Sequence, residues 1–328
     1  MKIKKWLILF LFLGINSVIA QLPLNSLDFD GNNDYVSSTL PTVFNDIANN
    51  DFTIETWIKP NGSAFARVIF AQLNATNFAS ISLSSSNQVY FYVNNVSSES
   101  TSTTLPSGVW SHIACTWDAS TSLIEIYING TLATTSFGGT STLGNNNVMA
   151  IGAKTNGTQF FTGELDELRI WDVIRNPCQI SIAMNSEFTI SQPNLVAYYN
   201  FNQGTAGGTN AGITSLPDFT TNYDGTLLNF GLTGASSNWL ASGATINAVN
   251  QISVAPTTDV QTACNSYTWI DGNTYTGSNS TATYTLTNTA GCDSVVTLDL
   301  TMSFSNAGTD VQTACNSYTW IDGNTYTN

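Results

Sequence analysis

The segment FTIETWIKP, residues 52–60, decides the fold class because apolar side chains occupy both of its alternating faces. Phe52, Ile54 and Ile58 point to one face of an extended strand, and Trp57 points to the other. Outward from this segment, runs of about six to nine residues recur between turn residues: ARVIFAQ (66–72), FASISLS (78–84), QVYFYVN (88–94), WSHIACTWD (110–118) and SLIEIYING (122–130). Short strands at this spacing predict an all-β protein with a two-sheet sandwich or jelly roll. One helix is expected at 177–187, with proline at its start.

The first 20 residues have the pattern of a secretory signal peptide. Three lysines precede an apolar run, 6–13, that is too short to span a bilayer, and small residues lead to Ala20. We expect residues 1–20 to be removed and the mature protein to be secreted or displayed at the cell surface, with no transmembrane segment. A membrane anchor or a buried strand is the alternative interpretation.

The charge of the chain excludes nucleic acid as a partner. The formal net charge is −14, and removal of residues 1–20 leaves five basic and 22 acidic residues, or −17. Nucleic-acid binding needs a basic surface, which this composition lacks. Only 9% of residues are charged. A surface of Asn, Thr, Ser and Gly is typical of an extracellular β-protein.

The chain divides into a large domain and a repetitive C-terminal part. We expect the large domain at 21–240 and a linker of small polar residues at 241–257. The 19 residues TDVQTACNSYTWIDGNTYT at 258–276 recur unchanged at 309–327. This predicts one repeat at 258–308 and an incomplete one at 309–328. Each copy contains Asp-Gly between aromatic-rich runs, which predicts a hairpin. Because the sequence ends inside the second copy, it is expected to be a fragment of a longer protein.

The five cysteines are distributed between these two parts, with two in the large domain and three in the repeats. Cys264 and Cys292 flank most of the complete repeat, and a bridge between them would stabilise a small domain by about 3 kcal/mol. We therefore predict disulfide-stapled repeats, with free thiols as the alternative. Cys115 and Cys178 could form a second bridge, or each could be a small buried apolar residue. The sequence does not decide between these two alternatives.

Several segments, in order along the chain, carry a family resemblance. They are LDFDGNNDYVSS (27–38), FTIETWIKP (52–60), GVWSHIACTWD (108–118), IYING (126–130), FTGELDELRIWDVIRNPCQI (161–180), LVAYYNFNQG (195–204) and DGTLLNF (224–230). Residues 22–240 resemble the laminin-G-like (LamG) domains of the concanavalin A-like lectin/glucanase superfamily. The repeat resembles Cys-containing modules of Bacteroidetes surface proteins. The resemblance implies a jelly-roll sandwich that binds, or in some members hydrolyses, carbohydrate.

The catalytic motif of the superfamily's glucanases is broken in this chain. Those enzymes carry two carboxyl groups about 5 Å apart in a Glu-x-Asp-x-x-Glu strand. Here Glu164 and Asp166 match the first two positions, but Arg169 occupies the third, and a guanidinium cannot act as the acid or base. The only histidine, His112, lies in a predicted strand, where a structural role is the more common one. We therefore predict no catalytic residues, although an atypical enzyme is not excluded.

Calcium is the one cofactor that the sequence suggests. Asp30, Asn32 and Asp34 alternate in DFDGNNDYV and could offer three side-chain oxygens, the ligands that Ca²⁺ prefers. The competing interpretation is a turn in which Asp and Asn side chains bond to the local backbone.

Two tyrosines are the candidates for ligand contact. Tyr90 and Tyr92 share one face of the strand predicted at 88–94, and Phe160 and Phe161 lie near a loop. An aromatic stripe in a sandwich more often belongs to the core.

These observations give one functional hypothesis and two alternatives. The hypothesis is a secreted or surface-displayed, non-catalytic binding or adhesion protein whose partner is an extracellular glycan or a surface protein. The first alternative is an atypical glycoside hydrolase or an accessory domain of a polysaccharide-degrading protein. The second is a purely structural domain.

Overall fold

The computed structural model describes residues 24–62, 64–72, 78–94, 96–139, 148–246, 257–287, 293–305 and 308–327. Residues 1–20, for which we predict a signal peptide, lie outside this set, as do residues 247–256 of the predicted linker. The chain forms two compact units, 1–253 and 254–328. No described helix is long and apolar enough to cross a membrane.

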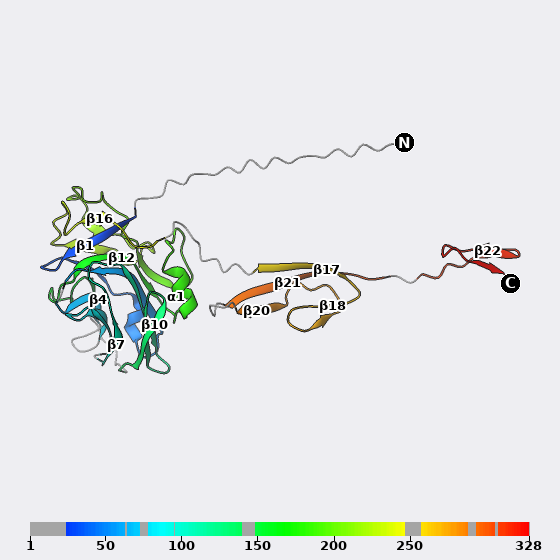
Figure 1. Ribbon diagram of the computed structural model, residues 1–328, viewed down its shortest axis with the longest axis horizontal. Helices are drawn as coiled ribbons and strands as arrows, with labels where there is room; N and C mark the ends of the chain where they lie inside the picture. Colours follow the sequence, from blue (N-terminus) through cyan, green and yellow to red (C-terminus); the bar gives the residue numbers. More distant parts are fainter. Residues whose placement is uncertain are drawn as a thin grey trace. The chain divides into compact units, whose positions relative to one another are not determined.

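The first unit contains two sheets, and every strand pair in them is antiparallel (Figure 1). We call the first sheet A. Seven of its strands are hydrogen-bonded in one continuous order, and the eighth, β13, pairs with β12 on the same edge as β1 but farther along that strand. The strands of sheet A, in spatial order, are β10 (Thr131–Phe137), β9 (Leu123–Ile128), β8 (Ser111–Asp118), β3 (Phe52–Pro60), β12 (Thr162–Trp171), β1 (Asn25–Asp30) and β16 (Trp239–Ala241), with β13 (Leu195–Tyr199) off this path.

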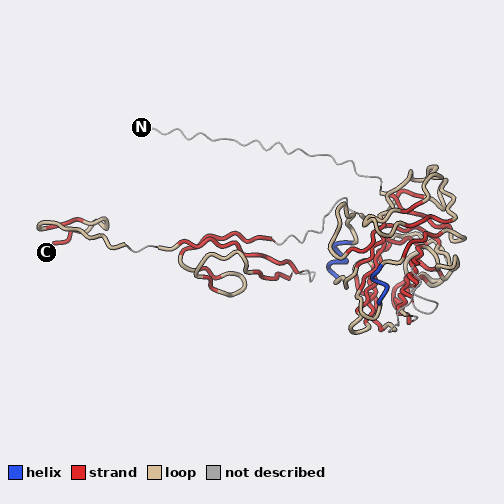
Figure 2. Tube along the Cα trace, turned by 180° about the vertical axis from the view of Figure 1, so that it is seen from behind, coloured by secondary structure: helices blue, strands red, loops and turns tan. Residues whose placement is uncertain are grey.

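Sheet B is the second layer of the sandwich (Figure 2). Its strands come from distant parts of the sequence. For example, β2 pairs with β11 although more than 100 residues separate them. Its strands, in spatial order, are β14 (Ser215–Leu216), β15 (Gly225–Leu228), β2 (Tyr35–Thr39), β11 (Val148–Ile151), β4 (Ala66–Gln72), β5 (Phe78–Leu83), β6 (Gln88–Val93) and β7 (Val96–Thr104). The predicted all-β, two-sheet jelly roll is confirmed.

The core of this unit lies between the two sheets. Phe52, Ile54 and Ile58 of β3 belong to it, whereas Trp57 does not, as their alternation predicts. The alternate residues of the facing strands in sheet B complete the core. A short 3-10 helix, η1 (Thr42–Asp46), adds Phe44, whose ring packs edge-on to that of Phe52 with centroids 5.0 Å apart.

The outer face of sheet A is covered by the helix α1 (Pro177–Ala183) and the segment that follows it. Asn176 caps α1 by accepting a hydrogen bond from the Gln179 backbone, and the Gln179 side chain returns one to the Asn176 backbone by accepting from its N–H. The indole of Trp57 donates to the carbonyl oxygen of Met184 at 2.6 Å. The helix is therefore at the predicted position, but it ends at Ala183, four residues earlier than predicted.

The second unit contains a three-stranded sheet and two hairpins. The sheet has the order β17 (Thr257–Cys264), β21 (Asp293–Ser303) and β20 (Thr283–Thr287). The hairpins are β18 (Tyr267–Thr268) with β19 (Thr274–Tyr275), and β22 (Ser317–Thr319) with β23 (Thr325–Thr327). Both form at the Asp-Gly pairs as predicted.

The disulfide predicted between Cys264 and Cys292 is not seen. Cys264 is free and exposed. It pairs with Ser303 in the parallel ladder of β17 and β21, and Asp293 begins β21 ten residues earlier. At about 3.3 Å per residue these ends are about 30 Å apart, whereas bridged Cα atoms lie about 4–7 Å apart. Cys292 itself lies outside the described residues. The prediction of a staple failed because spacing along the chain does not reveal a parallel pairing.

The structure also answers whether Cys115 and Cys178 form a disulfide. Cys115 is a free thiol, fully buried in the core between the sheets, so it does not bridge to Cys178. Burial raises its pKa far above the usual value, as expected for an inert apolar residue.

Candidate ligand-binding face

Aromatic side chains gather on the outer face of sheet B over strands β4, β5 and β6. In strands β4, β5 and β6 alternate residues enter the core, and those between them face away from it. The outward positions carry Phe70, Phe78, Tyr90 and Tyr92, and Phe65 lies just before β4. Their ring centroids are 4.8–6.4 Å apart from one neighbour to the next. We call these five residues the aromatic platform.

Tyr90 and Tyr92 are therefore part of this surface, as their shared strand face suggested. Their rings are stacked, with centroids 6.0 Å apart and planes 21° from parallel. Both are partly exposed, and neither belongs to the core. Phe161, in contrast, is buried in the core, and Phe160 packs beside Tyr35 at 6.4 Å. The structure thus separates the two aromatic pairs that the sequence singled out.

Arg67 lies at the centre of the aromatic platform. Its guanidinium carbon is 4.7 Å from the ring centre of Tyr92 and 4.9, 5.4 and 5.5 Å from those of Phe65, Phe70 and Phe78. Such distances are within the range of cation–π attraction. Among the described residues, three neutral groups accept its hydrogen bonds: Ser82 Oγ at 2.7 Å, Gln159 Oε1 at 3.0 Å and Ser80 Oγ at 3.3 Å.

This guanidinium is a buried cation that has no acidic partner among the described residues. Arg67 is only 8% exposed, and it forms no ion pair within the described part of the chain. Burial lowers its pKa, and Tyr92 opposes that shift, yet an arginine stays protonated in proteins. Lys154, with its ammonium 5.8 Å from the Phe70 ring, is a second cation at this face. The protein is strongly acidic overall, so two cations at one face that form no ion pair among the described residues are a local exception.

Sequence reasoning found the two tyrosines but missed Arg67. A β-bulge between Arg67 and Ile69 shifts the alternation of β4, so that Val68 and Ile69 both reach the core. In the sequence, Arg67 is simply one charged residue in an apolar run. Its position beneath aromatic rings depends on the pairing of β4 with β5 and of β5 with β6.

The residues that match the glucanase motif do not form an open site. Glu164 is 6% exposed and is bound by Lys59 Nζ and Ser26 Oγ, each at 2.6 Å. Asp166 is 1% exposed and accepts a hydrogen bond from Ser242 at 2.6 Å. Both carboxyl groups are therefore already paired with the protein's own side chains.

Arg169, at the third position of the motif, lies in a buried charged network between sheet A and α1. Its guanidinium donates to Glu167 and to the carbonyl oxygen of Ala183, and it lies 3.6 Å from Glu55. Tyr198 donates to Glu167 at 2.8 and 2.9 Å. Arg169 thus forms ion pairs with Glu167 and Glu55, and this network joins β12 to β3 and to the segment that covers them.

His112 is part of the same network and is poorly placed for proton transfer to a ligand. The ring is fully buried, 3.5 Å from Glu55, and burial lowers its pKa to about 4, against the attraction of Glu55. It is therefore neutral at pH 7. Its ring packs edge-on to Trp57 at 5.6 Å, which agrees with a structural role.

The proposed calcium residues form a turn between the two sheets. Asp30 accepts hydrogen bonds from the backbone and the side-chain amide of Asn32, at 2.8 and 3.1 Å. Asp34 accepts one from the Asp30 backbone at 3.0 Å, and its other oxygen, Oδ1, is buried without a partner. Burial, with Asp28 and Asp30 nearby, raises the pKa of Asp34 to about 6.

This geometry fits a calcium ion only in part. Asn32 and both oxygens of Asp30 already serve the turn, and the described residues contain no cluster of three acids or other common ligands suited to a metal. Only the unpartnered oxygen of Asp34 favours a cation. Calcium binding here stays a prediction.

Comparison with known proteins finds a family-model match within the first unit. Residues 30–181 match the family model described as the concanavalin A-like lectin/glucanases superfamily. This match supports a LamG-like domain in this part of the chain. Among curated proteins, "Sushi, von Willebrand factor type A, EGF and pentraxin domain-containing protein 1" is 28% identical over 127 residues in Rattus norvegicus and 26% identical over 129 residues in Mus musculus. These alignments cover 35% of this chain but only 4% of the relatives.

Solved structures to which this chain shows similarity include a protein from Bacteroides ovatus described as a candidate carbohydrate-binding protein. It is 20% identical, with a TM-score of 0.49, and the alignment covers 63% of this chain and 58% of that one. A heptameric SAP-like pentraxin from Limulus polyphemus is 20% identical, with a TM-score of 0.39 and coverage of 49% and 81%.

Proposed function

We propose that the first unit is a non-catalytic carbohydrate-binding module and that its ligand lies on the aromatic platform of sheet B. One observation carries this proposal: four aromatic rings, of which those of Phe65, Phe78 and Tyr92 are partly exposed, surround a cation that has no acidic partner in the described part of the chain. Tyrosine rings with one accessible face can stack on the apolar face of a sugar ring, and polar groups around them fix its orientation.

The charge of the platform indicates which sugars it would prefer. Arg67 and Lys154 both lie against the Phe70 ring without an ion pair among the described residues. A uronate or sulfate group on a glycan would supply the missing negative charge, and an arginine guanidinium suits planar carboxylates. We therefore propose acidic glycans as the preferred ligands.

The alternative, an atypical glycoside hydrolase, gains no support from the geometry. Retaining hydrolysis needs two carboxyl groups that can reach opposite sides of one glycosidic bond. Glu164 is held by Lys59, and Asp166 is buried under Ser242. An accessory role beside a catalytic domain is compatible with the binding proposal.

We further propose that this module is exported and displayed outside the cell, with the Cys-containing repeats as a spacer. The pattern of residues 1–20, the low content of charged residues and the 51-residue repeat period support this part of the proposal. The resemblance of the repeat to modules of Bacteroidetes surface proteins points the same way.

A binding screen tests the choice of ligand. The full chain is applied to an array of neutral, uronate-bearing and sulfated oligosaccharides, and each hit is compared with its carboxyl-reduced or desulfated form. We expect the acidic form to bind more tightly, with an affinity that falls as salt rises. The Lys154→Met variant should weaken acidic ligands while leaving the unit folded. Equal binding of acidic and neutral forms contradicts the charge preference, and no binding by any glycan contradicts the proposed function.

A further inference from the structure

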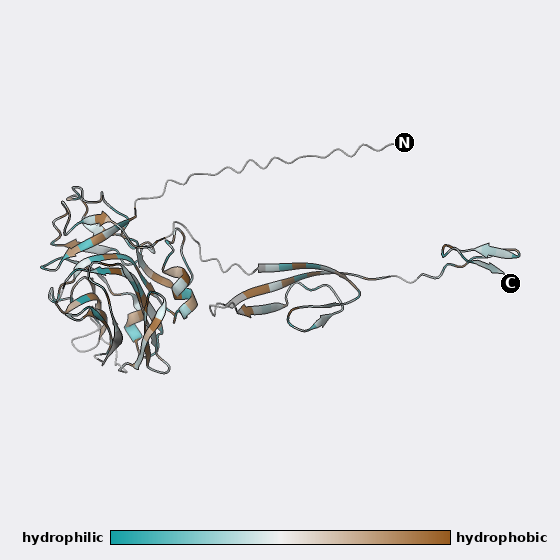
Figure 3. Cartoon of the chain, in the orientation of Figure 1, coloured by the Kyte–Doolittle hydropathy of each residue, from teal (hydrophilic) through white to brown (hydrophobic). Residues whose placement is uncertain are grey.

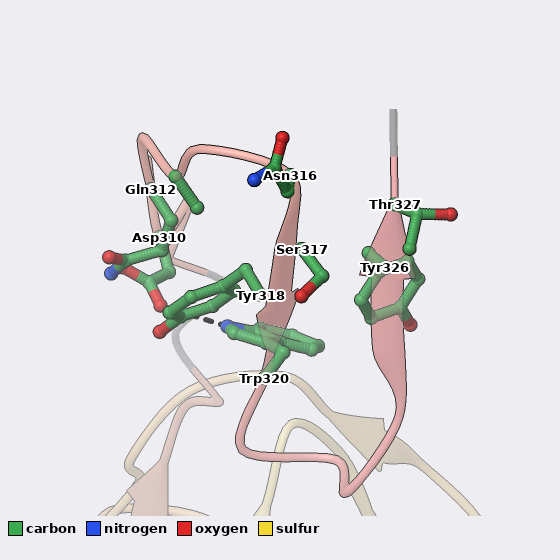
Figure 4. Close-up of a pocket in the computed structure, with 9 residues that line it drawn as sticks. Asp310, Gln312, Asn316, Ser317, Tyr318, Trp320, Tyr326 and Thr327 are labelled. Carbon is green, nitrogen blue, oxygen red and sulfur yellow. Dashed lines mark hydrogen bonds between the residues drawn. The ribbon is translucent and has the colours of Figure 1, made fainter.

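An aromatic-lined space in the second unit is explained by the repeat itself. Trp320 lines a space of about 440 Å³, and its indole donates to Asp310 at 2.8 Å (Figure 4). In the first copy of the repeat, the equivalent Trp269 is 3% exposed and packs against β21, which is largely hydrophobic (Figure 3). The space beside Trp320 is therefore the position that β21 takes in the first copy. The cation and the aromatic rings suited to a ligand lie instead on the aromatic platform of the first unit.

Arg67 lies over β5 because this strand carries small residues at its outward positions. Ser80 is opposite Phe70 of β4 and Tyr92 of β6 in the register of sheet B. Ser82 is opposite Arg67 itself. The two serine hydroxyls are 3.1 Å apart and fully buried. Larger side chains at these two positions would fill the space that the guanidinium occupies between the rings.

Gln159 holds Arg67 at two points. Its side-chain Oε1 accepts a hydrogen bond from Arg67 Nε at 3.0 Å, and its backbone oxygen accepts one from the Arg67 backbone at 2.9 Å. Gln159 belongs to the loop 152–159, which follows β11. At the other end of this loop, the Gly152 backbone donates to the carbonyl oxygen of Val68 at 2.8 Å. The loop is therefore tied to β4 at both ends.

The backbone of Gln159 is in an unfavourable conformation. Its φ is +58°, in the left-handed region that few residues other than glycine, asparagine and aspartate adopt. Such conformations are often found where a side chain serves a binding site. Glycine would take this backbone without strain, and what glutamine adds is a neutral oxygen within reach of Arg67.

The hydrogen bonds of Arg67 leave one of its nitrogen atoms for a ligand. Nε donates to Gln159, and Nη1 donates to Ser82 and Ser80. A guanidinium has five N–H groups, and the two on Nη2 have no acceptor among the described residues. The three acceptors are neutral, so they orient the guanidinium without neutralising its charge.

We propose that Gln159 is a positioning residue that sets the selectivity of the aromatic platform for acidic glycans, an inference that rests on the proposed function. Gln159 fixes Arg67 with a neutral oxygen, so that Nη2 and the positive charge stay free for the acidic group of the sugar. A glutamate at this position would fix Arg67 equally well but would supply the negative charge itself. The side-chain amide of one loop residue thus decides whether the platform prefers acidic or neutral sugars.

The test measures affinities by calorimetry on the full chain. The ligands are a uronate oligosaccharide with its carboxyl-reduced form, and a sulfated oligosaccharide with its desulfated form. Gln159→Glu should lower the affinity for the acidic forms at least about tenfold, weaken its salt dependence and leave the neutral forms unchanged. Gln159→Met keeps the charge of Arg67 but offers its Nε no oxygen, so the acidic affinity should fall less and stay salt-dependent. Both variants have an unbranched side chain of similar length and meet the same backbone cost.

The matched control is Thr158→Glu, which adds the same charge one residue away. Thr158 is exposed, and its hydroxyl donates to Asn156 at 2.6 Å rather than to the platform. This variant should change the acidic affinity less than about twofold. If the wild type prefers acidic forms and Gln159→Glu keeps that preference, or Thr158→Glu lowers it as much, the role of Gln159 is overturned and the proposed function stands. If the wild type binds both forms equally or binds neither, the proposed function itself fails, and the role of Gln159 with it.

Discussion

Substitution of Asp34 by asparagine should remove a pH-dependent loss of stability from the first unit. Asp34 is fully buried, one of its oxygens has no partner, and burial raises its pKa from 3.8 to about 6. A carboxyl group with a raised pKa in the folded state binds its proton more tightly there than in the unfolded chain. The loss of folding stability caused by ionising Asp34 is therefore absent below about pH 4 and complete above about pH 7.

The size of this effect follows from the pKa shift. About two pKa units correspond to about 3 kcal/mol, as an upper limit because the site relaxes. The amide oxygen of the introduced asparagine can still accept the hydrogen bond from the Asp30 backbone, which Asp34 accepts at 3.0 Å. We expect Asp34→Asn to match the wild type at pH 4 and to be about 2–3 kcal/mol more stable at pH 8. Urea denaturation of the full chain, in EDTA across this pH range, measures the difference.

The same experiment tests calcium. If Asp34 contributes to a calcium site, excess calcium at pH 8 should raise the stability of the wild type and not that of Asp34→Asn. A calcium effect of equal size in both proteins places any site elsewhere. If the stability of the two proteins depends on pH in the same way in EDTA, ionisation of the buried Asp34 carboxyl group does not destabilise the wild type, and the reasoning is refuted.

Arg169→Met should lower the free energy of unfolding by about 3–5 kcal/mol in the same assay, because it leaves buried acids without their cation. Lys59→Met is the control: that side chain is 33% exposed, so its loss should cost about 1 kcal/mol or less, and equal costs would contradict the distinction. Iodoacetamide should modify Cys264 and Cys315 in the native protein but Cys115 only after unfolding, as read by mass spectrometry. Resistance of Cys264 without reductant would contradict the free thiol seen here.

Much of the sandwich could be predicted because its strands carry local signals. The two-sided pattern of 52–60 predicted a strand with apolar contacts on both faces. In the structure, Trp57 lies outside the core and contacts the segment after α1. The Asp-Gly pairs correctly predicted both hairpins. These features depend on neighbours only a few residues away.

Features that depend on pairing between distant strands were missed. The cysteine spacing suggested a bridge from Cys264 to Cys292, but the parallel register puts Cys264 opposite Ser303. Arg67 escaped notice because its aromatic neighbours come from three strands and a bulge shifts its own strand. The turn at Asp30 connects β1 and β2, which belong to different sheets, and the local sequence of the turn does not show this.

The central claim, that sugars bind the aromatic platform of sheet B, is tested most directly by one comparison of affinities. A uronate oligosaccharide is titrated by calorimetry into the full-length wild type, Tyr92→Ala and Phe137→Ala. Phe137 is an exposed aromatic residue, 64% accessible, on the edge strand β10 of the other sheet. We predict that Tyr92→Ala lowers the affinity at least about tenfold and that Phe137→Ala leaves it unchanged. Equal affinities for all three proteins would contradict the account.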